Sequence, residues 1–359
     1  MKLENILRSA VLGFALLGAV GCYSGDVICS TPGVSVGRIK KIKPRIRMGN
    51  TPAPTIGITY LGNENLGRHC YASGVSEKNG ILLTMKAGHI DIFHTRESAD
   101  YAAYLAADVF ERIKKKEKKF SFKLSDPSVY HVSLNYPDNW ENISEKEKKI
   151  FDISVGLGEY LAFTAESWHE IITWHGYNST VILTEFPSAF SWEDNFSNLL
   201  GIKVAGEALR SGGKYDEKVT EILGREVGKL IPIAEKEAVR ISRKLKGSWY
   251  TGEMPFGDVV IKKRNFDIGL SGKLTPLVPF ASGKVESFPV PSLNFLSQYG
   301  VSAEVEIEPR VSEKGEIFKI LGRNRKGGKI NPDNDFKKIM EKIRHDGVEL
   351  YGEKVDCAE

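Results

Sequence analysis

The amino-acid sequence predicts an α+β fold with N-terminal strands, a central helical bundle, and a C-terminal β-rich segment with a closing helix. From Thr95 to about residue 118, and again from about Glu145 to residue 246, apolar residues recur every three or four positions, which is the period of an amphipathic helix. The segments on both sides are rich in β-branched residues, and 301–309 alternates apolar and polar residues as a half-buried strand does. Because helices and strands do not alternate strictly, the pattern favours α+β over α/β.

The first 21 residues have the pattern of a bacterial lipoprotein signal peptide. Two basic residues precede an apolar stretch of 11 residues, 10–20, and Gly21 then leads to Cys22. The segment AVGC resembles a lipobox. The apolar stretch is about half as long as the ~20 residues that a spanning helix needs. We therefore expect cleavage before Cys22 and lipidation of its thiol, the alternative being an uncleaved N-terminal anchor.

Acyl chains on Cys22 would tether the mature protein to a membrane of the cell envelope. Tyr23 follows where a retention signal would have Asp. By resemblance to Gram-negative lipoproteins, this predicts the outer membrane, facing the periplasm, if the source has two membranes. The net charge of +4 argues against a nucleic-acid partner. One disulfide could form in an oxidising envelope among three further cysteines, which are Cys29, Cys70 and Cys357.

Residues 22–49 form a predicted tether between the lipid and the folded body. This segment contains Gly, Ser and Pro and ends in RIKKIKPRIR, residues 38–47, with six basic side chains in ten. Such a run could contact anionic head groups close to the anchor. Alternatively, it could be a solvated linker or an edge strand whose isoleucines pack inward.

A mainly helical α+β core domain is expected from residue 50 to 246. The expected strands are 55–62 and 79–93, where β-branched and aromatic residues stand between Gly and Asn turns. A helix should run from Thr95 to about residue 118, and a polar loop containing proline should occupy 124–143. The remaining predicted helices are Glu145 to Trp174, 191–210, 214–230 and 232–246.

The C-terminal region, residues 247–359, is predicted to be rich in strands. The segment VSAEVEIEP, 301–309, is its clearest strand, and several prolines punctuate the sequence before it. The chain should close with a helix near 332–345.

The first candidate site is GHIDIFHTRESAD, residues 88–100. If the segment begins as a strand, His89 and Asp91 share one face because side chains alternate, and His94 follows at the strand's end. Two imidazoles and a carboxylate within six residues are ligand types on which Zn²⁺ or Fe²⁺ draws. The alternative is a structural role. In that case Asp91 would orient one of the histidines, and Arg96 would pair with Asp100 one helical turn later.

The second candidate site is AESWHEIITWHGY, residues 165–177. On a helix, Glu166, His169 and Glu170 share one face with Thr173. A Glu-x-x-His pair can ligate a metal from one helical face, and Glu170 could act as a general base. The segment is not the HExxH zinc motif, because Thr173 stands where the second histidine is needed. The prediction depends on this helix facing the segment that bears His94.

The third candidate site is TEFPSAFSWEDNFSNLLG, residues 184–201. Ser191, followed three residues later by Asp194, predicts a variant of the capping box at a helix start. The density of polar and aromatic residues exceeds what capping needs. Glu185 and Asp194 are therefore candidates for the wall of a pocket.

Together, these motifs resemble a family of exported bacterial lipoproteins catalogued only as a domain of unknown function. The resemblance rests on GHIDIFHTR, HEIITW and SAFSWEDNFSNLLG, in this order, and covers most of the mature chain. It implies no activity and assigns no catalytic residue.

The residues themselves favour metal-assisted hydrolysis at a site with one divalent ion, Zn or Fe. The expected ligands are Asp91, His94 and His169, with His89 or Glu166 completing the shell and Glu170 as general base. Envelope polymers or lipids are the expected substrates, from location alone. The competing hypothesis is a non-catalytic envelope scaffold or binding lipoprotein, in which the same residues form a buried hydrogen-bond network.

Overall fold

The computed structural model describes residues 43–47, 49–54, 57–72, 76–178, 185–252, 259–281, 283–324 and 328–357, together with the backbone of residues 28 and 29. Its α-helices are α2 (Ile92–Lys114), α3 (Lys146–Trp174), α4 (Asp194–Ser211), α5 (Tyr215–Lys229), α6 (Glu235–Lys244), α7 (Lys314–Leu321) and α8 (Pro332–Tyr351). Its 3-10 helices are η2 (Asn63–Asn65), η3 (Trp140–Asn142), η4 (Phe186–Ser188) and η5 (Leu293–Tyr299).

The strands are β1 (Ile28–Cys29), β2 (Ile81–Thr84), β3 (Gly88–Asp91), β4 (Lys119–Phe122), β5 (Val129–Asn135), β6 (Gly213–Lys214), β7 (Tyr250–Thr251), β8 (Val260–Ile261), β9 (Lys273–Leu274), β10 (Phe288–Pro289) and β11 (Ser302–Glu308). Strands come first, helices occupy the centre, and strands with a closing helix follow. The predicted α+β class is confirmed.

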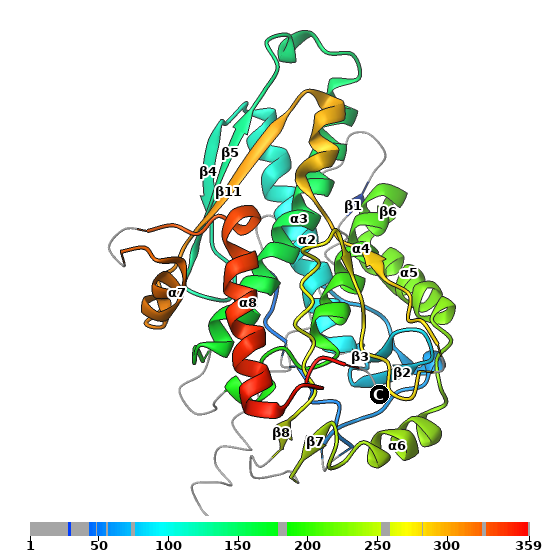
Figure 1. The fold of residues 1–359 in the computed structure, drawn as a ribbon. Coiled ribbons are helices and arrows are strands. Elements are labelled where there is room, and N and C mark those ends of the chain that lie inside the picture. The colour runs from blue at the N-terminus through cyan, green and yellow to red at the C-terminus, as the bar shows by residue number, and fades with distance from the viewer. Residues whose placement is uncertain are drawn as a thin grey trace, which may run out of the picture.

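Helices α2, α3 and α4 form the centre of the molecule (Figure 1). Glycines allow their close approach: Gly158 of α3 lies against Ala102 and Ala106 of α2, and Gly201 of α4 lies against Thr95 of α2. A side chain at either glycine would overlap the backbone of α2. This close packing brings the polar faces of the three helices together near the N-terminus of α2.

β2 and β3 form an antiparallel hairpin whose second strand continues directly into α2. The predicted strand 79–93 is therefore two short strands with a turn between them, and the helix begins at Ile92 rather than Thr95. Asp91 caps this helix, because its carboxylate accepts a hydrogen bond of 2.8 Å from the Phe93 N–H. The first candidate motif thus lies where a strand end meets a helix N-terminus.

A three-stranded antiparallel sheet, in the order β11-β5-β4, packs on the helices through Tyr130, Val132 and Leu134. The prediction of a loop over 124–143 is wrong where the structure has β5. The apolar residues of β5 alternate with less buried ones, as in a half-buried strand. Flanking prolines, Pro127 and Pro137, obscured this pattern. The preceding helix also ends earlier than predicted, at Lys114, which leaves room for β4.

The region after Gly247 contributes to the same apolar core as the central helices. Val305 of β11 and Phe336 of α8 join the core cluster that α2 and α3 form. The predicted strand 301–309 is confirmed as β11, and the closing helix is confirmed as α8, which continues to Tyr351. β7 to β10 are only two residues each, so most of the described backbone between Gly247 and η5 is irregular. The helix α7 was not predicted.

The predicted signal peptide and Cys22 lie outside the described residues, as does most of the tether. Within the described chain, every helix is too short or too polar to cross a membrane. The end of the tether does not match an edge strand with inward-facing isoleucines, because Ile46 is 73 % exposed and Arg47 is buried. No disulfide joins Cys70 to Cys357, and the side chain of Cys29 lies outside the described part.

Candidate functional site

Acidic and imidazole side chains from α2, α3, α4 and the residues just before α2 and α4 converge near the N-terminus of α2. We call this set the His94 centre, and it consists of Asp91, His94, Glu97, Glu166, His169, Glu170, Glu193 and Asp194. Each other member interacts electrostatically with His94, with Asp194, or with both. The three motifs singled out in the sequence therefore meet in one place.

His94 lies between two carboxylates. Its Nδ1 is 2.9 Å from Asp194 Oδ1 and 3.8 Å from Asp91 Oδ2. The shorter distance pairs the imidazole with the Asp194 carboxylate, which raises the pKa of His94. The two distances bracket the ~3.4 Å that separates ligand atoms in a tetrahedral zinc shell. The His94 side chain keeps 26 % of its exposure, whereas that of Asp91 keeps none, so the centre is reached from outside at His94.

The carboxyl groups of the centre are hard to ionise together. Burial raises the pKa of Glu166 to about 8, and Glu97 adds to this shift. Burial, and then Asp194, also raises the pKa of Glu170 to about 8. Burial likewise raises the pKa of Asp91 to about 6. The first cause of each shift is burial, which disfavours the charged carboxylate, and neighbouring carboxyl groups add to it.

Positive charge in the centre comes chiefly from His94. Burial opposes the charged imidazole, but Asp194 and Asp91 outweigh it and raise the pKa of His94. Arg264 also interacts electrostatically with Glu170 and Asp194, yet its guanidinium donates to backbone carbonyls such as those of Pro187 and Ile261. Six carboxyl groups therefore share one readily charged imidazole.

Two glutamates of α3 are oriented by neighbouring elements. Glu166 accepts a hydrogen bond of 3.0 Å from Ser98 of α2. Glu170 accepts the backbone N–H of Phe190, which has a φ of 55°. This left-handed conformation is uncommon for an aromatic residue, and it points the N–H at Glu170. One oxygen of Glu170 is thus fixed.

His169 approaches the same centre from one helical turn away. It is half-buried, and its Nδ1 has no hydrogen-bond partner. Burial lowers its pKa, which favours the neutral imidazole that ligates metals. Its ring meets that of Tyr177 edge to face, with centroids 6.1 Å apart. Glu185, which was predicted for a pocket wall, interacts electrostatically with His169 and lies at this side of the centre.

His89 stands apart from the His94 centre. Its Nε2 is 2.7 Å from Ser242 Oγ, and its Nδ1 accepts a hydrogen bond of 3.1 Å from the Trp192 indole. Burial lowers the pKa of His89 to about 3. Because both ring nitrogens are satisfied in the core, the prediction of His89 as a metal ligand is wrong.

The predicted capping box at Ser191 is also wrong. The Ser191 hydroxyl donates to Glu193, no side chain caps α4, and the Asp194 carboxylate turns toward His94. Asp194 was predicted as a pocket residue, and the structure places it beside His94. Glu97 and Glu193 were not predicted. Glu97 lies one helical turn after His94, so helical spacing could have identified it.

A segment that we call the N-terminal strap, residues 43–47, 49 and 50, passes over the exposed side of His94. The Arg47 N–H donates to Glu97 at 2.9 Å, and the Asn50 N–H donates to Asp91. Gly49 lies so close to the imidazole that a Cβ there would overlap His94 Nε2. The strap therefore occupies the side from which a ligand would meet Nε2.

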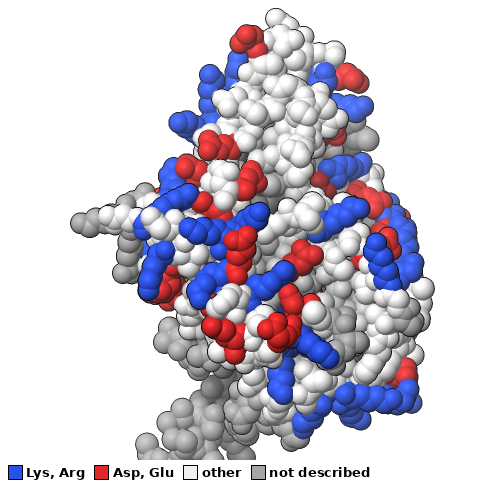
Figure 2. Space-filling model, viewed as in Figure 1, with Lys and Arg blue, Asp and Glu red and all other residues white. Residues whose placement is uncertain are grey.

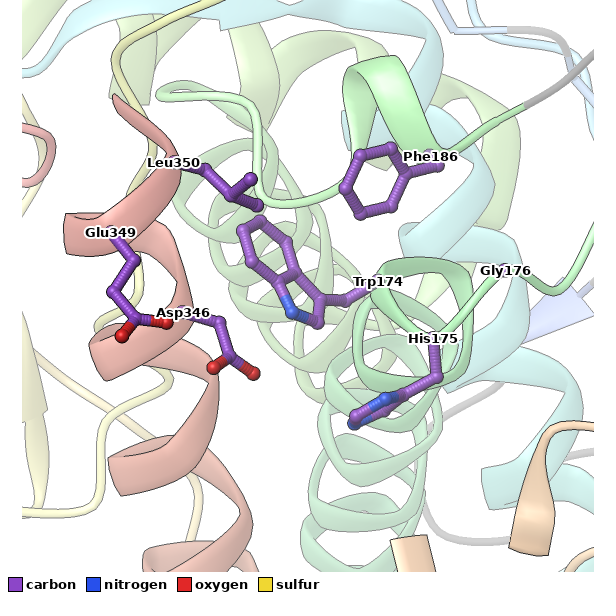
Figure 3. Close-up of a pocket in the computed structure, with 7 residues that line it drawn as sticks. All are labelled: Trp174, His175, Gly176, Phe186, Asp346, Glu349 and Leu350. Carbon is purple, nitrogen blue, oxygen red and sulfur yellow. The ribbon is translucent and has the colours of Figure 1, made fainter. Parts of the chain in front are cut away.

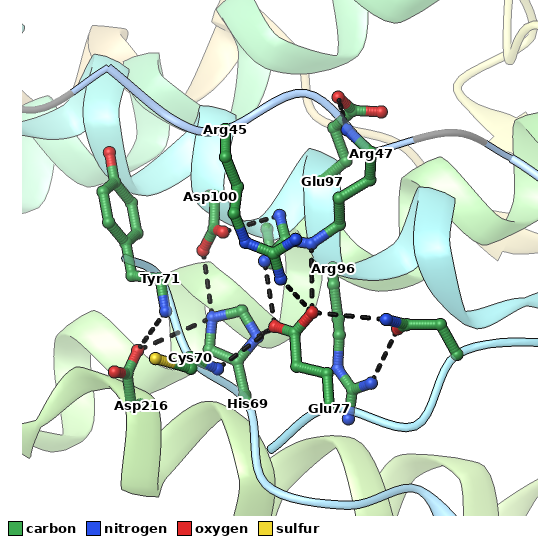
Figure 4. Close-up of polar contacts among 12 residues, drawn as sticks. Arg45, Arg47, His69, Cys70, Tyr71, Glu77, Arg96, Glu97, Asp100 and Asp216 are labelled. Atoms are coloured by element: carbon green, nitrogen blue, oxygen red, sulfur yellow. Dashed lines mark hydrogen bonds and ion pairs between the residues drawn. The ribbon is translucent and has the colours of Figure 1, made fainter. Parts of the chain in front are cut away.

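The side chains of the strap enter a second buried cluster, the Arg47 network, which is built around Arg47, Glu77, Asp100 and His69 (Figure 4). The Arg47 guanidinium is 3.0 Å from Glu77 and 2.7 Å from Asp100, and all three side chains are fully buried. Burial alone would raise the pKa of Glu77, but Arg47 outweighs it and lowers that pKa to about 2. The suggested pairing of Arg96 with Asp100 does not occur, because Arg96 donates to the carbonyls of Leu66 and Lys78.

Among the described residues, one group of three offers ligand atoms that all lie within 4.8 Å of one another: His345, Asp346 and Glu349 on α8. It adjoins an open pocket of about 510 Å³, lined by Trp174, His175, Gly176, Phe186, Asp346, Glu349 and Leu350 (Figure 3). Asp346 already pairs with Lys342. The His94 centre has a closer pair but no such closed group of three, so binding a cation there would require side-chain adjustment.

Comparison with known families gives one match. A family described as Protein of unknown function (DUF4056) matches residues 47–279, more than half of the chain. The chain belongs to this family. The DUF4056 match contains the whole His94 centre and the Arg47, Gly49 and Asn50 contacts of the strap, whereas the α8 group lies beyond it. Neither curated proteins nor solved structures give a match.

Proposed function

We propose that this DUF4056 protein is a metal-dependent hydrolase of the bacterial cell envelope, with the His94 centre as its active site. The observation that carries this proposal is that His94 Nδ1 lies 2.9 Å from Asp194 Oδ1 and 3.8 Å from Asp91 Oδ2. These atoms lie among six carboxyl groups from α2, α3, α4 and the residues just before α2 and α4. Burying so many carboxyl groups is costly unless they are protonated, paired or bound to a cation.

Asp91, His94 and Asp194 would hold the cation, because their ligand atoms already lie within 4 Å of His94 Nδ1. Carboxylate and imidazole ligands suit Zn²⁺ or Fe²⁺. A divalent ion at this place would activate water for attack on a substrate bond. Among nearby groups, Glu166 and the unpartnered His169 Nδ1 would complete the ligand shell.

Glu170 would receive the proton of the attacking water. Burial and Asp194 raise its pKa to about 8, and a carboxylate with such a pKa is a stronger base than an exposed one. The Phe190 N–H holds one oxygen of Glu170, which leaves the other to accept a proton. The N-terminal strap would have to move for a substrate to enter the centre from the Nε2 side of His94, because Gly49 lies against that atom.

The envelope location is part of the proposal and rests on the signal-like residues 1–21 and on Cys22. Envelope polymers or lipids follow as substrates from location alone. Changing Cys22→Ser should release the protein from the membrane fraction or block its processing. Unchanged anchoring of this variant would refute lipidation at Cys22.

Elemental analysis of the full chain, purified without chelators, tests the metal centre. We expect about one equivalent of zinc or iron, lost in His94→Ala and in Asp194→Asn because each removes a ligand. His345→Ala is the matched control, since it removes an imidazole from the surface group on α8. Metal lost only in His345→Ala would place the ion on α8. Absence of metal from the parent protein, with His94→Ala changing stability alone, would favour the non-catalytic network.

A further inference from the structure

We propose that one edge of the molecule docks on an anionic membrane surface. This edge, which we call the basic edge, is formed by the turn between β2 and β3, the connection between α5 and α6, α6 itself, and the turn at Phe280. It exposes large apolar side chains beside a helix whose outer face is basic. The inference is independent of the proposed hydrolase activity.

Apolar side chains project from three neighbouring turns. Met85 is 62 % exposed, Ile231 is 46 % exposed, and Phe280 is 60 % exposed. The Met85 N–H donates to the Ile231 carbonyl at 2.9 Å, so these two residues are adjacent. Gly88, at the end of the same turn as Met85, touches Leu277 and Val278, which places the Phe280 turn beside it. Large apolar side chains gathered at a surface indicate a site of interaction.

The backbone holds two of these side chains in a disfavoured conformation. Ile231 has a φ of 59° and Phe280 a φ of 56°. Positive φ is a genuine outlier for β-branched and bulky residues, which crowd their own backbone there. The fold therefore retains apolar residues at two turns where Gly or Asn would be less strained. Such outliers persist where the surrounding structure or a function requires them.

α6 provides positive charge alongside these turns. Ala238 of α6 packs with Leu83 of β2, and Leu245, just after the helix, packs with Leu277. The exposed basic side chains of the edge are Lys86, Lys236, Arg240, Arg243, Lys244 and Lys246. Acidic side chains of α6 are fewer, and one of them, Glu237, pairs with Arg240. Figure 2 shows Lys and Arg gathered along the lower edge of the molecule, where Figure 1 places α6.

Charge complementarity favours an anionic bilayer as the occupant of this edge. Lys and Arg side chains would contact lipid phosphates. The side chains of Met85, Ile231 and Phe280 would each insert into the head-group region. Together with an acyl anchor, such contacts would fix the orientation of the folded body on the membrane.

Vesicle binding of the full chain tests this proposal. Every variant carries Cys22→Ser, so that no lipid is attached and the first 21 residues contribute equally. The vesicles contain phosphatidylcholine with or without phosphatidylglycerol, at low and high salt. The combined change Lys236→Gln, Arg243→Gln and Lys244→Gln should weaken binding to phosphatidylglycerol vesicles by about fivefold for each charge removed. Met85→Ser with Phe280→Ser should weaken binding by about tenfold.

Two controls on α8 test whether a loss of vesicle binding is specific to the basic edge. Leu350→Ser removes an apolar side chain that is also 60 % exposed, and Lys337→Gln with Lys338→Gln removes exposed charges from α8. Both should bind like the parent, and circular dichroism should show all variants folded. Equal losses in the control and edge variants, no loss in the edge variants, or equal binding of the parent to both vesicle types would each overturn the proposal.

Discussion

The His94 centre and the Arg47 network are two buried clusters that share α2, yet they neutralise their carboxyl groups in different ways. In the Arg47 network, a guanidinium lies within 3.0 Å of two carboxylates, and the pKa of Glu77 falls to about 2. In the His94 centre, burial raises the pKa of Glu166 to about 8. Because both clusters are buried, the difference arises from the available countercharge. We infer that the network stabilises the fold, whereas the centre requires protons or a cation.

The largest expected effect comes from removing the countercharge of the network. Arg47→Met leaves Glu77 and Asp100 buried beside each other without their shared guanidinium. Breaking a buried ion pair in this way typically costs about 3–5 kcal/mol. Urea denaturation should show this loss. Arg225→Met, which breaks only exposed ion pairs, should change stability little. Similar effects of the two changes would contradict the structural role of the network.

The next effect is a dependence on pH that only the His94 centre should produce. Glu166 and Glu170 have pKa values near 8 in the folded state, against an ordinary value of 4.5. The metal-free folded state therefore holds more protons than the unfolded state in this window, so stability should fall as pH rises from about 4.5 to 8. The raised pKa of His94 acts in the same direction, because its stabilising charge is lost as pH rises through that pKa.

Thermal unfolding in chelator between pH 5 and 8 checks this slope, which is worth on the order of 1.4 kcal/mol for each unit of pKa shift. Zn²⁺ should restore stability more at pH 8 than at pH 5, because metal ligands bind in their deprotonated forms. The double change Glu166→Gln with Glu170→Gln should flatten the slope. If stability in chelator instead increases with pH, the carboxylates of the His94 centre are already neutralised by nearby positive charge.

A smaller effect should follow from crowding the strap. A Cβ in Gly49→Ala would overlap His94 Nε2, so either the strap or the imidazole must shift. Overpacking of this kind costs about 1–3 kcal/mol, and we expect metal content to fall with it. Gly224→Ala is the control, because a Cβ at this helical position meets nothing within 4 Å. That control should stabilise the protein by about 0.5–1 kcal/mol. Unchanged stability and metal content in Gly49→Ala would place the strap away from the centre.

The sequence predicted the elements with long, regular patterns most accurately. The predicted helix from Glu145 to Trp174 differs from α3 by one residue, since its apolar period continues through eight turns. The strand β5 was missed because it is short and flanked by prolines. The start of α2 was shifted because Asp91 caps that helix, and the start of α4 was shifted because no side chain caps it and Asp194 turns toward His94.

The sequence predicted which residues would belong to the candidate site better than it predicted which residues each of them would contact. The sequence indicated that His94, Glu166 and Glu170 belong together if their segments meet, and the packing of α2 on α3 brings them together. It could not show that His89 faces Trp192 and Ser242, which lie more than 100 residues away in the chain. The same limit applies to Asp194, whose direction is set by the turn that precedes α4.

The most direct test of the comparison is a difference in sign between the effects of two isosteric changes on stability. Glu170→Gln keeps an oxygen for the Phe190 N–H and removes charge from the crowded centre, so metal-free protein at pH 8 should gain about 1–2 kcal/mol. Glu77→Gln removes charge from a balanced network and should lose about 1–3 kcal/mol, because Arg47 then lacks one of its two carboxylates. Urea denaturation in chelator measures both. Destabilisation by both changes would mean that carboxylates are equally well neutralised in the two clusters, and the proposed cation site would lose its electrostatic basis.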